Sequence, residues 1–399
     1  MLSFKESYDL IYSEFNNLEL KIGTVLLEDA QGRTLAEDVI ADVNLPSFDN
    51  SAVDGLAIKF AENVREWNIS AEVSAGNYAE IEGNDSVLIM TGAKVPPQFN
   101  TVIPLEDYII NNNTAKLNDS VTLKNGINIR PKASDVSKTE IVVSKNIFLT
   151  PRKIAAIAAC GKSEIKVYNK LIVAILATGD ELIPISEKPT GDKIRVSNNY
   201  GLTAAVNALH QKGINYSFIN DEYEATKNKI MGLIDSDADI ILTTGGVSVG
   251  KFDYLKEIYS ELGVKEVFWR ANIKPGKPIY FGKFDNGQKV KLIFGLPGNP
   301  VSCMVNFDIY LKPNIIMKYG MPKQVRVRAK LLNNIIKRDA KRHYVRACFE
   351  RKKSEYFVTS QLSQSSGNIA GYSKSNCLIE LTEDIRNPVN GEIVECILI

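Results

Sequence analysis

The clearest pattern of hydrophobic and polar positions begins near Lys170, where short apolar runs alternate with amphipathic segments. The runs 171–177, 214–219 and 239–243 predict buried strands, and the segment 197–212 predicts a helix between the first two. Such alternation is typical of right-handed strand–helix–strand units. We therefore expect an α/β domain with a parallel sheet covered by helices on both faces and ligands at the carboxyl ends of its strands.

The chain on either side of this region is richer in predicted strands. Ser3 and Glu6 form a capping box for an amphipathic helix, and residues 149–161 predict a second helix. Between residues 55 and 144, short apolar runs are separated by Gly, Asn and Pro, which predicts strands and tight turns. Alternating runs return after Lys323 and predict a small all-β unit at the C-terminus.

Composition narrows the class of protein. The 399 residues are 44% hydrophobic and 24% charged, with a net charge of +1. The chain as a whole therefore does not attract anions, and any anion must be bound by a local group of residues. No apolar run approaches the roughly 18 residues of a membrane span, and the N-terminus lacks the apolar core of a signal peptide. The five cysteines are scattered and there are two histidines, which argues against structural zinc. These features predict a cytoplasmic globular protein that binds neither membranes nor nucleic acid.

One glycine-rich turn carries much of the chemistry. Residues 243–253, TTGGVSVGKFD, follow a predicted strand and precede the helix-like segment 254–262. Backbone N–H groups from such a turn converge on one spot, where the helix dipole favours an anion. The residues that would line it are Gly245, Gly246, Ser248 and Gly250. The spacing is close to that of a Walker A loop, but Phe252 stands where a Mg²⁺-binding hydroxyl is required, so an ordinary nucleotide-triphosphate loop is not expected.

A second turn of this kind lies in residues 291–302, KLIFGLPGNPVS. Asn299 stands at an N-cap position and Pro300 at the first helical position, where its missing N–H costs nothing. Between the two turns, prolines hold Lys274 and Lys277 on an extended segment that offers two compact positive charges. Each turn alone would pass as an ordinary α/β connection, but three anion-suited segments in about sixty residues predict a binding site.

Carboxylates lie beside these turns. Asp180 and Glu181 follow the predicted strand 171–177, Asp253 begins the helix after the glycine turn, and Asp54 lies in a polar, turn-rich stretch. Each acid alone is equally well explained as a turn or helix-terminal residue. Together, next to phosphate-suited loops, they are typical of a site in which Mg²⁺ bridges carboxylates and substrate phosphates.

These segments, in this order, resemble the molybdopterin molybdenumtransferase family, which includes bacterial molybdenum-insertion proteins and the E domain of gephyrin. The matching segments are 46–55 (PSFDNSAVDG), 90–93 (MTGA), 178–182 (TGDEL), 245–250 (GGVSVG), 273–278 (IKPGKP) and 295–302 (GLPGNPVS). The resemblance covers nearly the whole chain.

The resemblance implies an elongated protomer in which one domain is inserted into another, with a three-layer α/β/α molybdopterin-binding domain and a C-terminal β-barrel. The implied divisions are a linker domain (1–22, 37–53, 141–168), an inserted β-rich domain (23–36, 54–140), the α/β domain (169–319) and the barrel (323–399). It also implies a cytoplasmic homodimer that converts adenylylated molybdopterin and molybdate to molybdenum-loaded molybdopterin and AMP, with Mg²⁺ or another divalent ion. Transient contacts with the adenylyltransferase donor and with acceptor molybdoenzymes follow from that role.

The resemblance assigns roles by matched position. It implies that Asp54, Glu181 and Asp253 are the acidic catalytic and metal-binding residues. It implies substrate contacts from Thr91, Gly92, Asp135, Thr178, Gly179, Asp180, Ser197, Asn198, Gly245, Gly246, Ser248, Gly250, Lys274, Lys277, Pro278, Gly298, Asn299, Pro300, Ser302, Arg346 and Ser366. The chain departs from the family pattern at Ala133 and Ser134, where Gly-Glu is frequent, and at Val196, where Asp is frequent.

Two alternatives remain open from the sequence. One is a molybdopterin adenylyltransferase, although that activity belongs to proteins close to the isolated α/β domain and the flanking domains argue against it. The other is a gephyrin-like scaffold without catalysis, although the fused adenylyltransferase domain usual for that role is missing from this sequence. The basic cluster 337–353 lacks interleaved aromatic residues for stacking and is expected to be a solvated barrel face or an electrostatic rim.

Overall fold

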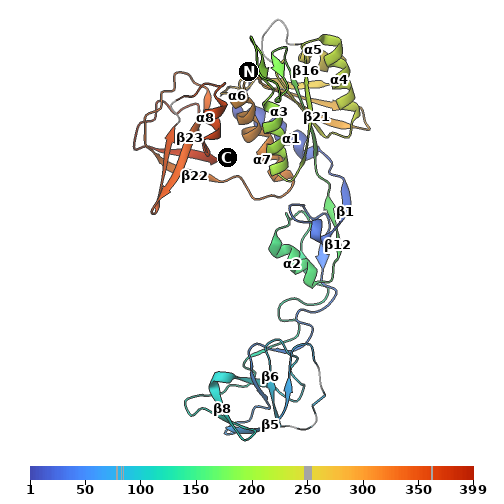
Figure 1. Cartoon of the computed structure of the whole chain (residues 1–399), viewed down its shortest axis with the longest axis vertical. Helices are drawn as coiled ribbons and strands as arrows, with labels where there is room; N and C mark the ends of the chain where they lie inside the picture. Colours follow the sequence, from blue (N-terminus) through green and yellow to red (C-terminus); the bar gives the residue numbers. More distant parts are fainter. Residues whose placement is uncertain (78–79, 82, 84, 247–253, 361–362) are drawn as a thin grey trace.

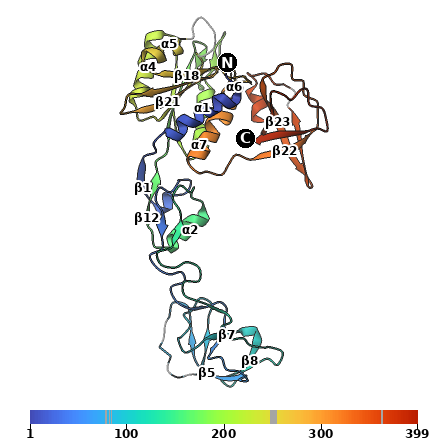
Figure 2. The ribbon, with the colours of Figure 1, turned by 180° about the vertical axis from the view of Figure 1, so that it is seen from behind.

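The computed structural model describes residues 1–399 apart from 78–79, 82, 84, 247–253 and 361–362. The molecule is elongated, with an α/β domain and a β-barrel side by side at one end and a β-rich domain at the other (Figure 1). A small linker unit joins the two ends, and the view from behind shows the same arrangement (Figure 2). No helix among the described residues is long and apolar enough to cross a membrane.

The α/β domain is built on a six-stranded sheet with the order β16-β13-β17-β21-β20-β18. Its strands are β13 (Ile172–Thr178), β16 (Lys212–Ile219), β17 (Ile240–Thr244), β18 (Lys265–Trp269), β20 (Tyr280–Asp285) and β21 (Val290–Leu296). The first four in the order are parallel, as expected, but β20 runs antiparallel to both β21 and β18. The expectation of a wholly parallel sheet was therefore wrong at this edge, because a short turn at 286–289 joins β20 directly to β21 as a hairpin.

Helices cover both faces of this sheet and complete the expected three layers. On one face, α4 (Tyr223–Asp235) and α5 (Leu255–Glu261) pack Ile230, Leu233 and Ile258 against Leu176 and Ile241. The other face is covered by α1 (Phe4–Asn17), α3 (Asn198–Ala208), α6 (Pro300–Asn306) and α7 (Lys312–Lys318), with a π-helical turn at Phe307–Leu311 between the last two. Burial of apolar surface on both faces explains why the strands read as continuous hydrophobic runs.

The predicted capping box is present at the start of α1. The Ser3 hydroxyl accepts from the Glu6 backbone N–H at 3.2 Å, and the Ser3 backbone N–H donates to the Glu6 carboxylate at 2.8 Å. This reciprocal pair satisfies two N–H groups that the first helical turn would otherwise leave unbonded. The helix buries Ile11 and Phe15 in the core of the α/β domain, so the first residues of the chain belong to this end of the molecule.

The C-terminal region forms a closed five-stranded barrel. Its strands are β22 (Arg326–Leu331), β23 (Arg342–Lys352), β24 (Glu355–Ser360), β25 (Cys377–Leu381) and β26 (Ile393–Leu398), and α8 (Ile369–Ser373) lies between β24 and β25. The barrel closes because β23 pairs with both β24 and β25. A two-residue strand of the α/β domain, β19 (Ile273–Lys274), pairs with β23, so that Lys274 lies opposite His343. This pairing joins the lysine segment of the α/β domain to the barrel.

The far end of the molecule contains a six-stranded sheet with the order β7-β4-β6-β5-β9-β8. Its strands are β4 (Gly55–Ile58), β5 (Glu66–Val73), β6 (Ser86–Ile89), β7 (Thr101–Pro104), β8 (Tyr108–Asn111) and β9 (Thr114–Leu117), with β3 (Asn50–Ser51) and β10 (Ile129–Arg130) paired beside it. Separate clusters of buried side chains on its two faces give this domain a core of its own.

The linker unit consists of two short strand pairs and a helix. These are β1 (Ile22–Leu26) with β12 (Glu164–Tyr168), β2 (Val39–Ile40) with β11 (Ile141–Val143), and α2 (Pro151–Ala159). Leu27 and Leu35 pack here with Val143 and Ile157. Residues 23–36 therefore lie in the linker unit and not in the β-rich domain, contrary to the division expected above; the other domain limits stay predictions.

Candidate functional site

The carboxyl ends of three parallel strands bring the predicted anion turns together. Strands β13, β17 and β21 are neighbours, and Ala177, Thr244 and Leu296 lie at matched positions in their register. The loops that follow them enclose a small cavity of about 70 Å³. The expected site residues that line it are Thr178, Glu181, Ser197, Asn198, Gly298 and Pro300, and the neighbouring side chains of Arg195 and Val196 complete the wall.

Thr178 is the buried polar residue at the centre of this edge. Its hydroxyl is buried, and within the described part of the chain it has no hydrogen-bond partner. Gly245 approaches it so closely that a Cβ there would lie 2.4 Å from the Thr178 carbonyl oxygen, and its φ of +90° also favours glycine. A buried hydroxyl left without a partner costs free energy, so this oxygen is a good candidate for a ligand contact.

A hydrogen bond joins the start of α3 to the second anion turn. The Asn198 side-chain amide donates to the Gly298 carbonyl at 2.8 Å, which fixes the turn next to the helix. Ser197 stands at the N-cap of α3, but its side chain makes no capping hydrogen bond, so its exposed hydroxyl is available to a ligand. Asn299 likewise occupies the N-cap of α6 without capping it, and Pro300 is at the first helical position as expected.

The two described acidic residues at this edge of the sheet differ in whether they line the small cavity. The Asp180 carboxylate accepts from the Asp221 backbone N–H at 3.0 Å and does not line the cavity, so it holds the loop. Glu181 does line the cavity, and Gly179 lies so close to it that a Cβ would meet its carboxylate at 2.4 Å. Three further expected residues, Ser248, Gly250 and Asp253, lie outside the described residues.

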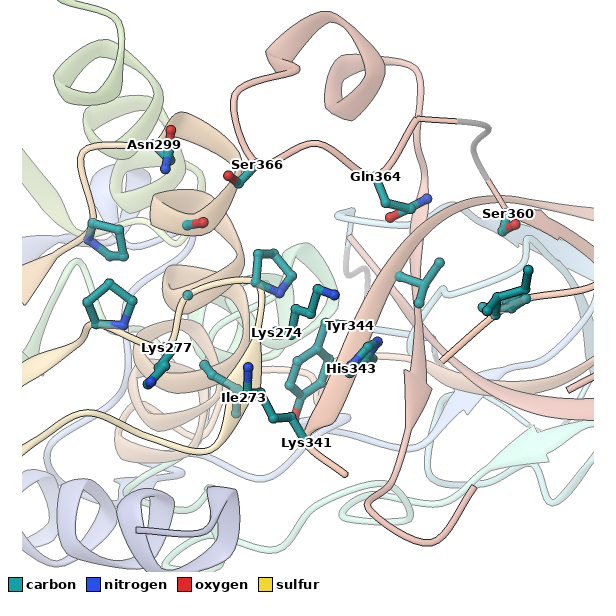
Figure 3. Close-up of a pocket in the computed structure, with 18 of the residues that line it drawn as sticks. Ile273, Lys274, Lys277, Asn299, Lys341, His343, Tyr344, Ser360, Gln364 and Ser366 are labelled. Carbon is teal, nitrogen blue, oxygen red and sulfur yellow. The ribbon is translucent and has the colours of Figure 1, made fainter. Parts of the chain in front are cut away.

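A larger cleft of about 610 Å³ lies between the α/β domain and the barrel (Figure 3). The expected site residues in its wall are Lys274, Lys277, Pro278, Asn299, Ser302 and Ser366. The barrel contributes side chains that the sequence had not suggested as ligands: Asn333, Asn334, Lys341, His343, Ser360 and Gln364. The cleft therefore combines cationic and neutral polar donors from two domains.

The turn 274–277, which carries the two lysines, is hydrogen-bonded to α6. Asn306 donates to the Gly276 carbonyl at 3.2 Å and to the Ser302 carbonyl at 3.0 Å. Gly276 has φ +99°, and a Cβ there would lie 2.5 Å from the Asn306 amide nitrogen, so the turn can approach the helix only with glycine at this position. The Lys274 side chain is left 57% exposed at the mouth of the cleft.

A carboxylate outside the predicted set organises the cationic end of the cleft. One oxygen of Asp339 bonds His343 Nε2 at 2.7 Å and accepts from the Lys341 backbone N–H at 3.1 Å. The other oxygen faces Lys274 Nζ at 3.8 Å and Lys341 Nζ at 3.9 Å. Burial works against ionisation, but the His343 hydrogen bond and the cations outweigh it and lower the pKa of Asp339 to about 2. Burial lowers the pKa of His343, although the Asp339 carboxylate favours the charged ring.

Arg346 does not line the cleft in the structure described, and its expected contact with substrate stays a prediction. Its side chain is 1% exposed, and its guanidinium donates to the carbonyls of Ser363, Ser365 and Asn368 at 2.8 to 2.9 Å. Arg346 therefore holds the loop that presents Ser366 to the cleft. Desolvation lowers its pKa without neutralising it.

Gly246 follows Gly245 at the strand ends, where a Cβ would lie 3.0 Å from the Thr178 hydroxyl. The other expected residues, Asp54, Thr91, Gly92 and Asp135, lie in the β-rich domain or beside it, at the opposite end of the molecule (Figure 1). Thr91 donates its backbone N–H and its hydroxyl to one oxygen of Asp54, at 2.6 and 2.8 Å, and Gly92 follows in the same turn. These bonds lower the pKa of the exposed Asp54 carboxyl. Asp135 is exposed on the connection to the linker, where its backbone N–H donates to the Leu45 carbonyl at 3.0 Å. One chain therefore does not bring Asp54 and Thr178 together.

Three family models match the chain in order. They describe the MoeA N-terminal region (domain I and II) over residues 2–161, a probable molybdopterin binding domain over 174–316, and the MoeA C-terminal region (domain IV) over 328–399. A molybdopterin molybdenumtransferase of Haemophilus influenzae is 33% identical over 378 residues, which cover 92% of this chain and 91% of that protein. This chain belongs to the molybdopterin molybdenumtransferase family.

Other relatives agree along the whole length of the chain. A molybdopterin molybdenumtransferase of Staphylococcus epidermidis is 30% identical over 409 residues and covers 100% of this chain and 95% of its own. The crystal structure of the molybdopterin biosynthesis moeA protein from Pyrococcus horikoshii OT3 is 27% identical, with a TM-score of 0.83 and all of both chains covered. The protein is thus a transferase that acts in molybdenum insertion during cofactor biosynthesis, and its multidomain fold is that of the family.

The barrel residues of the cleft escaped the sequence analysis for a physical reason. Residues 337–353 were interpreted only as a solvated face or an electrostatic rim because lysine and arginine dominate them. In the structure they include β23, which places Val345 and Ala347 in the barrel core, while Tyr344 packs in the core of the α/β domain. The uncharged residues 343–345 and 347–349 within this basic stretch were a signal that could have revealed a buried strand.

Proposed function

We propose that this molybdenumtransferase releases AMP from adenylylated molybdopterin while it inserts molybdate, and that both events occur around the turn from Gly298 to Ser302. The supporting observation is that one turn serves two cavities. Gly298 and Pro300 line the small cavity at the strand ends, whereas Asn299 and Ser302 line the cleft beside the lysines. A phosphate held in the first cavity would therefore be a near neighbour of an oxyanion held in the second.

The small cavity suits the phosphoanhydride that links the pterin phosphate to adenylate. Its backbone turns, the Thr178 hydroxyl and the Ser197 hydroxyl are donors for phosphate oxygens. Donors that are already fixed in place stabilise negative charge as it develops on a phosphorus centre, because they need not reorganise during the reaction. When a water oxygen forms a bond to one phosphorus atom, the bridging P–O bond breaks and the products are AMP and the molybdopterin phosphate. When an oxygen of molybdate attacks instead, a mixed phosphate–molybdate anhydride forms first, and water then cleaves it to the free phosphate.

The cleft suits molybdate, a tetrahedral dianion. Lys274, Lys277 and Lys341 supply positive charge, and Ser302 and Ser366 supply hydroxyl donors. Lysine ammonium groups are compact point charges with three donors each, which matches a small anion without planar geometry. The cleft also has room for part of the pterin, so the dithiolene would meet the oxyanion here.

A divalent cation such as Mg²⁺ fits the acidic edge of the small cavity. No group of three or more metal-binding side chains gathers in the part of the chain that the structure describes. Mg²⁺ needs no such cage, because it usually takes one or two carboxylates and completes its shell with phosphates and water. Glu181, which lines the cavity beside the unsatisfied Thr178 hydroxyl, would hold the ion, and Asp253 is the second candidate. The ion would supply neutralisation of phosphate charge.

The position of Asp54 supports a homodimer. Asp54 is ionised and oriented by Thr91, yet it lies in the β-rich domain at the far end from the two cavities of its own chain. A two-fold pair of elongated chains would let the β-rich domain of one chain meet the α/β domain of the other. Asp54 would then orient the attacking oxygen or share the divalent ion. Substrate would arrive from an adenylyltransferase, and product would pass to acceptor molybdoenzymes.

The direct test is a reaction with adenylylated molybdopterin. Purified protein, molybdate and Mg²⁺ should yield AMP, and omission of molybdate or addition of a chelator should strongly reduce it. Sulfate at the same concentration is the matched control, because it is also a tetrahedral dianion but cannot be inserted. A protein that binds adenylylated molybdopterin but yields no AMP under any of these conditions would overturn the proposal.

A further inference from the structure

Asp339 is a carboxylate beside a cleft that should receive a dianion. It precedes β23 and does not itself line the cleft, but it contacts Lys274, Lys341 and His343, which do and which Figure 3 shows. A negative charge here repels an incoming oxyanion and competes with it for the lysines. An acidic residue in this place therefore requires an explanation other than ligand binding.

The two carboxylate oxygens of Asp339 have different surroundings. One is fixed by two hydrogen bonds of ordinary length, from His343 at 2.7 Å and from the Lys341 backbone N–H at 3.1 Å. The other meets the Lys274 and Lys341 ammonium groups at 3.8 and 3.9 Å, distances beyond a normal hydrogen bond. The carboxylate is thus anchored on one side and only loosely paired on the side that faces the lysines.

We propose that Asp339 is a resident counter-ion which Lys274 and Lys341 exchange for the oxyanion when it enters the cleft. His343 is the positioning residue that keeps the carboxylate in place during the exchange. The inference rests on the proposed role of the cleft in oxyanion binding. When no oxyanion is bound, Asp339 reduces the repulsion between the Lys274 and Lys341 ammonium groups. It also lowers the affinity of the cleft for anions, so that a bound oxyanion can still leave the lysines and be inserted into molybdopterin.

The physical signature of a counter-ion is that its effect depends on the charge of the ligand. Asp339→Asn keeps the shape and an oxygen for His343, but it removes the negative charge. The lysines are then free for the ligand, and a dianion gains more than a monoanion because repulsion from Asp339 grows with ligand charge. Perrhenate is a tetrahedral monoanion of nearly the size of molybdate. Comparing the two ligands therefore shows the effect of ligand charge at nearly constant ligand shape.

The test is calorimetric titration of the full-length protein with molybdate and with perrhenate. We expect Asp339→Asn to tighten molybdate binding about tenfold and perrhenate binding about threefold at low ionic strength. The matched control is Glu383→Gln, since Glu383 has similar side-chain exposure (36% against 32%) but pairs at 3.1 Å with Arg342, which does not line the cleft. This control should leave both affinities unchanged.

The outcomes separate this inference from the assignment of the cleft. If the wild type binds molybdate and Asp339→Asn binds it no more tightly, the counter-ion role is wrong while the cleft assignment stands. Equal tightening in Glu383→Gln would also overturn it, because the effect would be one of net charge. If the folded wild type binds neither oxyanion, the assignment of the cleft fails and this inference fails with it. A thermal melt of each variant verifies that it is folded.

Discussion

Thr91 donates both its backbone N–H and its hydroxyl to the same oxygen of Asp54, at 2.6 and 2.8 Å. The two bonds favour the ionised carboxylate and lower its pKa, so Asp54 carries a full charge at neutral pH although it is exposed. A second oxygen remains on the same carboxylate. The turn therefore presents an oriented anion at the surface of the β-rich domain, a form suited to a cation or to an attacking water molecule.

Asp54→Asn should abolish most AMP release without unfolding the protein. We expect a fall of about 100-fold or more in turnover, because the charged oxygen that would hold the ion or orient the nucleophile is lost. The melting temperature should change by only a few degrees, since the side chain is exposed. Asp119→Asn, an exposed acid in the same domain, is the control and should keep full activity. Normal turnover in Asp54→Asn would contradict the assignment.

Elements with a strong local signal could be predicted from the sequence. The capping box placed the start of α1 correctly, and the apolar runs located β13 (Ile172–Thr178) and β17 (Ile240–Thr244). In each case the information is local: a cap residue, or a run long enough to be buried on both faces. The family was evident because the loop segments that carry the resemblance are short and contiguous.

Features that depend on distant contacts could not be predicted. Residues 23–36 have weak periodicity, and only packing against Val143 and Ile157 places them in the linker unit. Arg346 resembles a ligand in sequence, but the structure commits its donors to loop carbonyls. Asp339 gave no sequence signal at all, because its role depends on Lys274, which belongs to another domain. Tertiary contacts decide such cases and local patterns do not.

Lys274→Ala and Lys277→Ala should each weaken the use of molybdate more than the binding of adenylylated molybdopterin. Both lysines line the cleft and neither lines the small cavity at the strand ends. We expect the half-saturating molybdate concentration to rise about tenfold, with the KM for the pterin substrate changed much less. Lys289→Ala, at the opposite end of β21, is the control. Unchanged molybdate dependence in both cleft variants would count against the site.

Thr178→Val should impair substrate binding at little cost in stability. The hydroxyl is buried and has no hydrogen-bond partner among the residues that the structure describes, so its replacement by a methyl group should change the free energy of unfolding by less than about 0.5 kcal/mol. The KM for adenylylated molybdopterin should rise about fivefold if this hydroxyl donates to phosphate. Thr243→Val is the matched contrast, because the Thr243 hydroxyl bonds that of Tyr259 at 2.7 Å. It should destabilise by about 1 kcal/mol and leave the KM unchanged. The reverse pattern would refute the phosphate contact.

Arg346→Ala should mainly lower the stability of the fold. It would leave three loop carbonyls without their donor and a void where this buried side chain lies, so we expect a loss of about 3 kcal/mol in the free energy of unfolding. Arg328→Ala, whose side chain is 73% exposed beside Glu395, should cost less than about 0.5 kcal/mol. Denaturant titrations measure both. A fully stable Arg346→Ala protein with weakened molybdate binding would restore the ligand role that the structure argues against.

The central claim is that the α/β cavities of one chain and the Asp54 turn of another form a single site. Subunit exchange between Asp54→Asn and Lys274→Ala proteins tests it most directly, at a molybdate concentration where neither parent is active. In a heterodimer, one site would carry both intact residues and the other would carry both defects. We predict that heterodimers, isolated by two different affinity tags, recover about half of the wild-type AMP release. Heterodimers no more active than either parent would contradict the shared site.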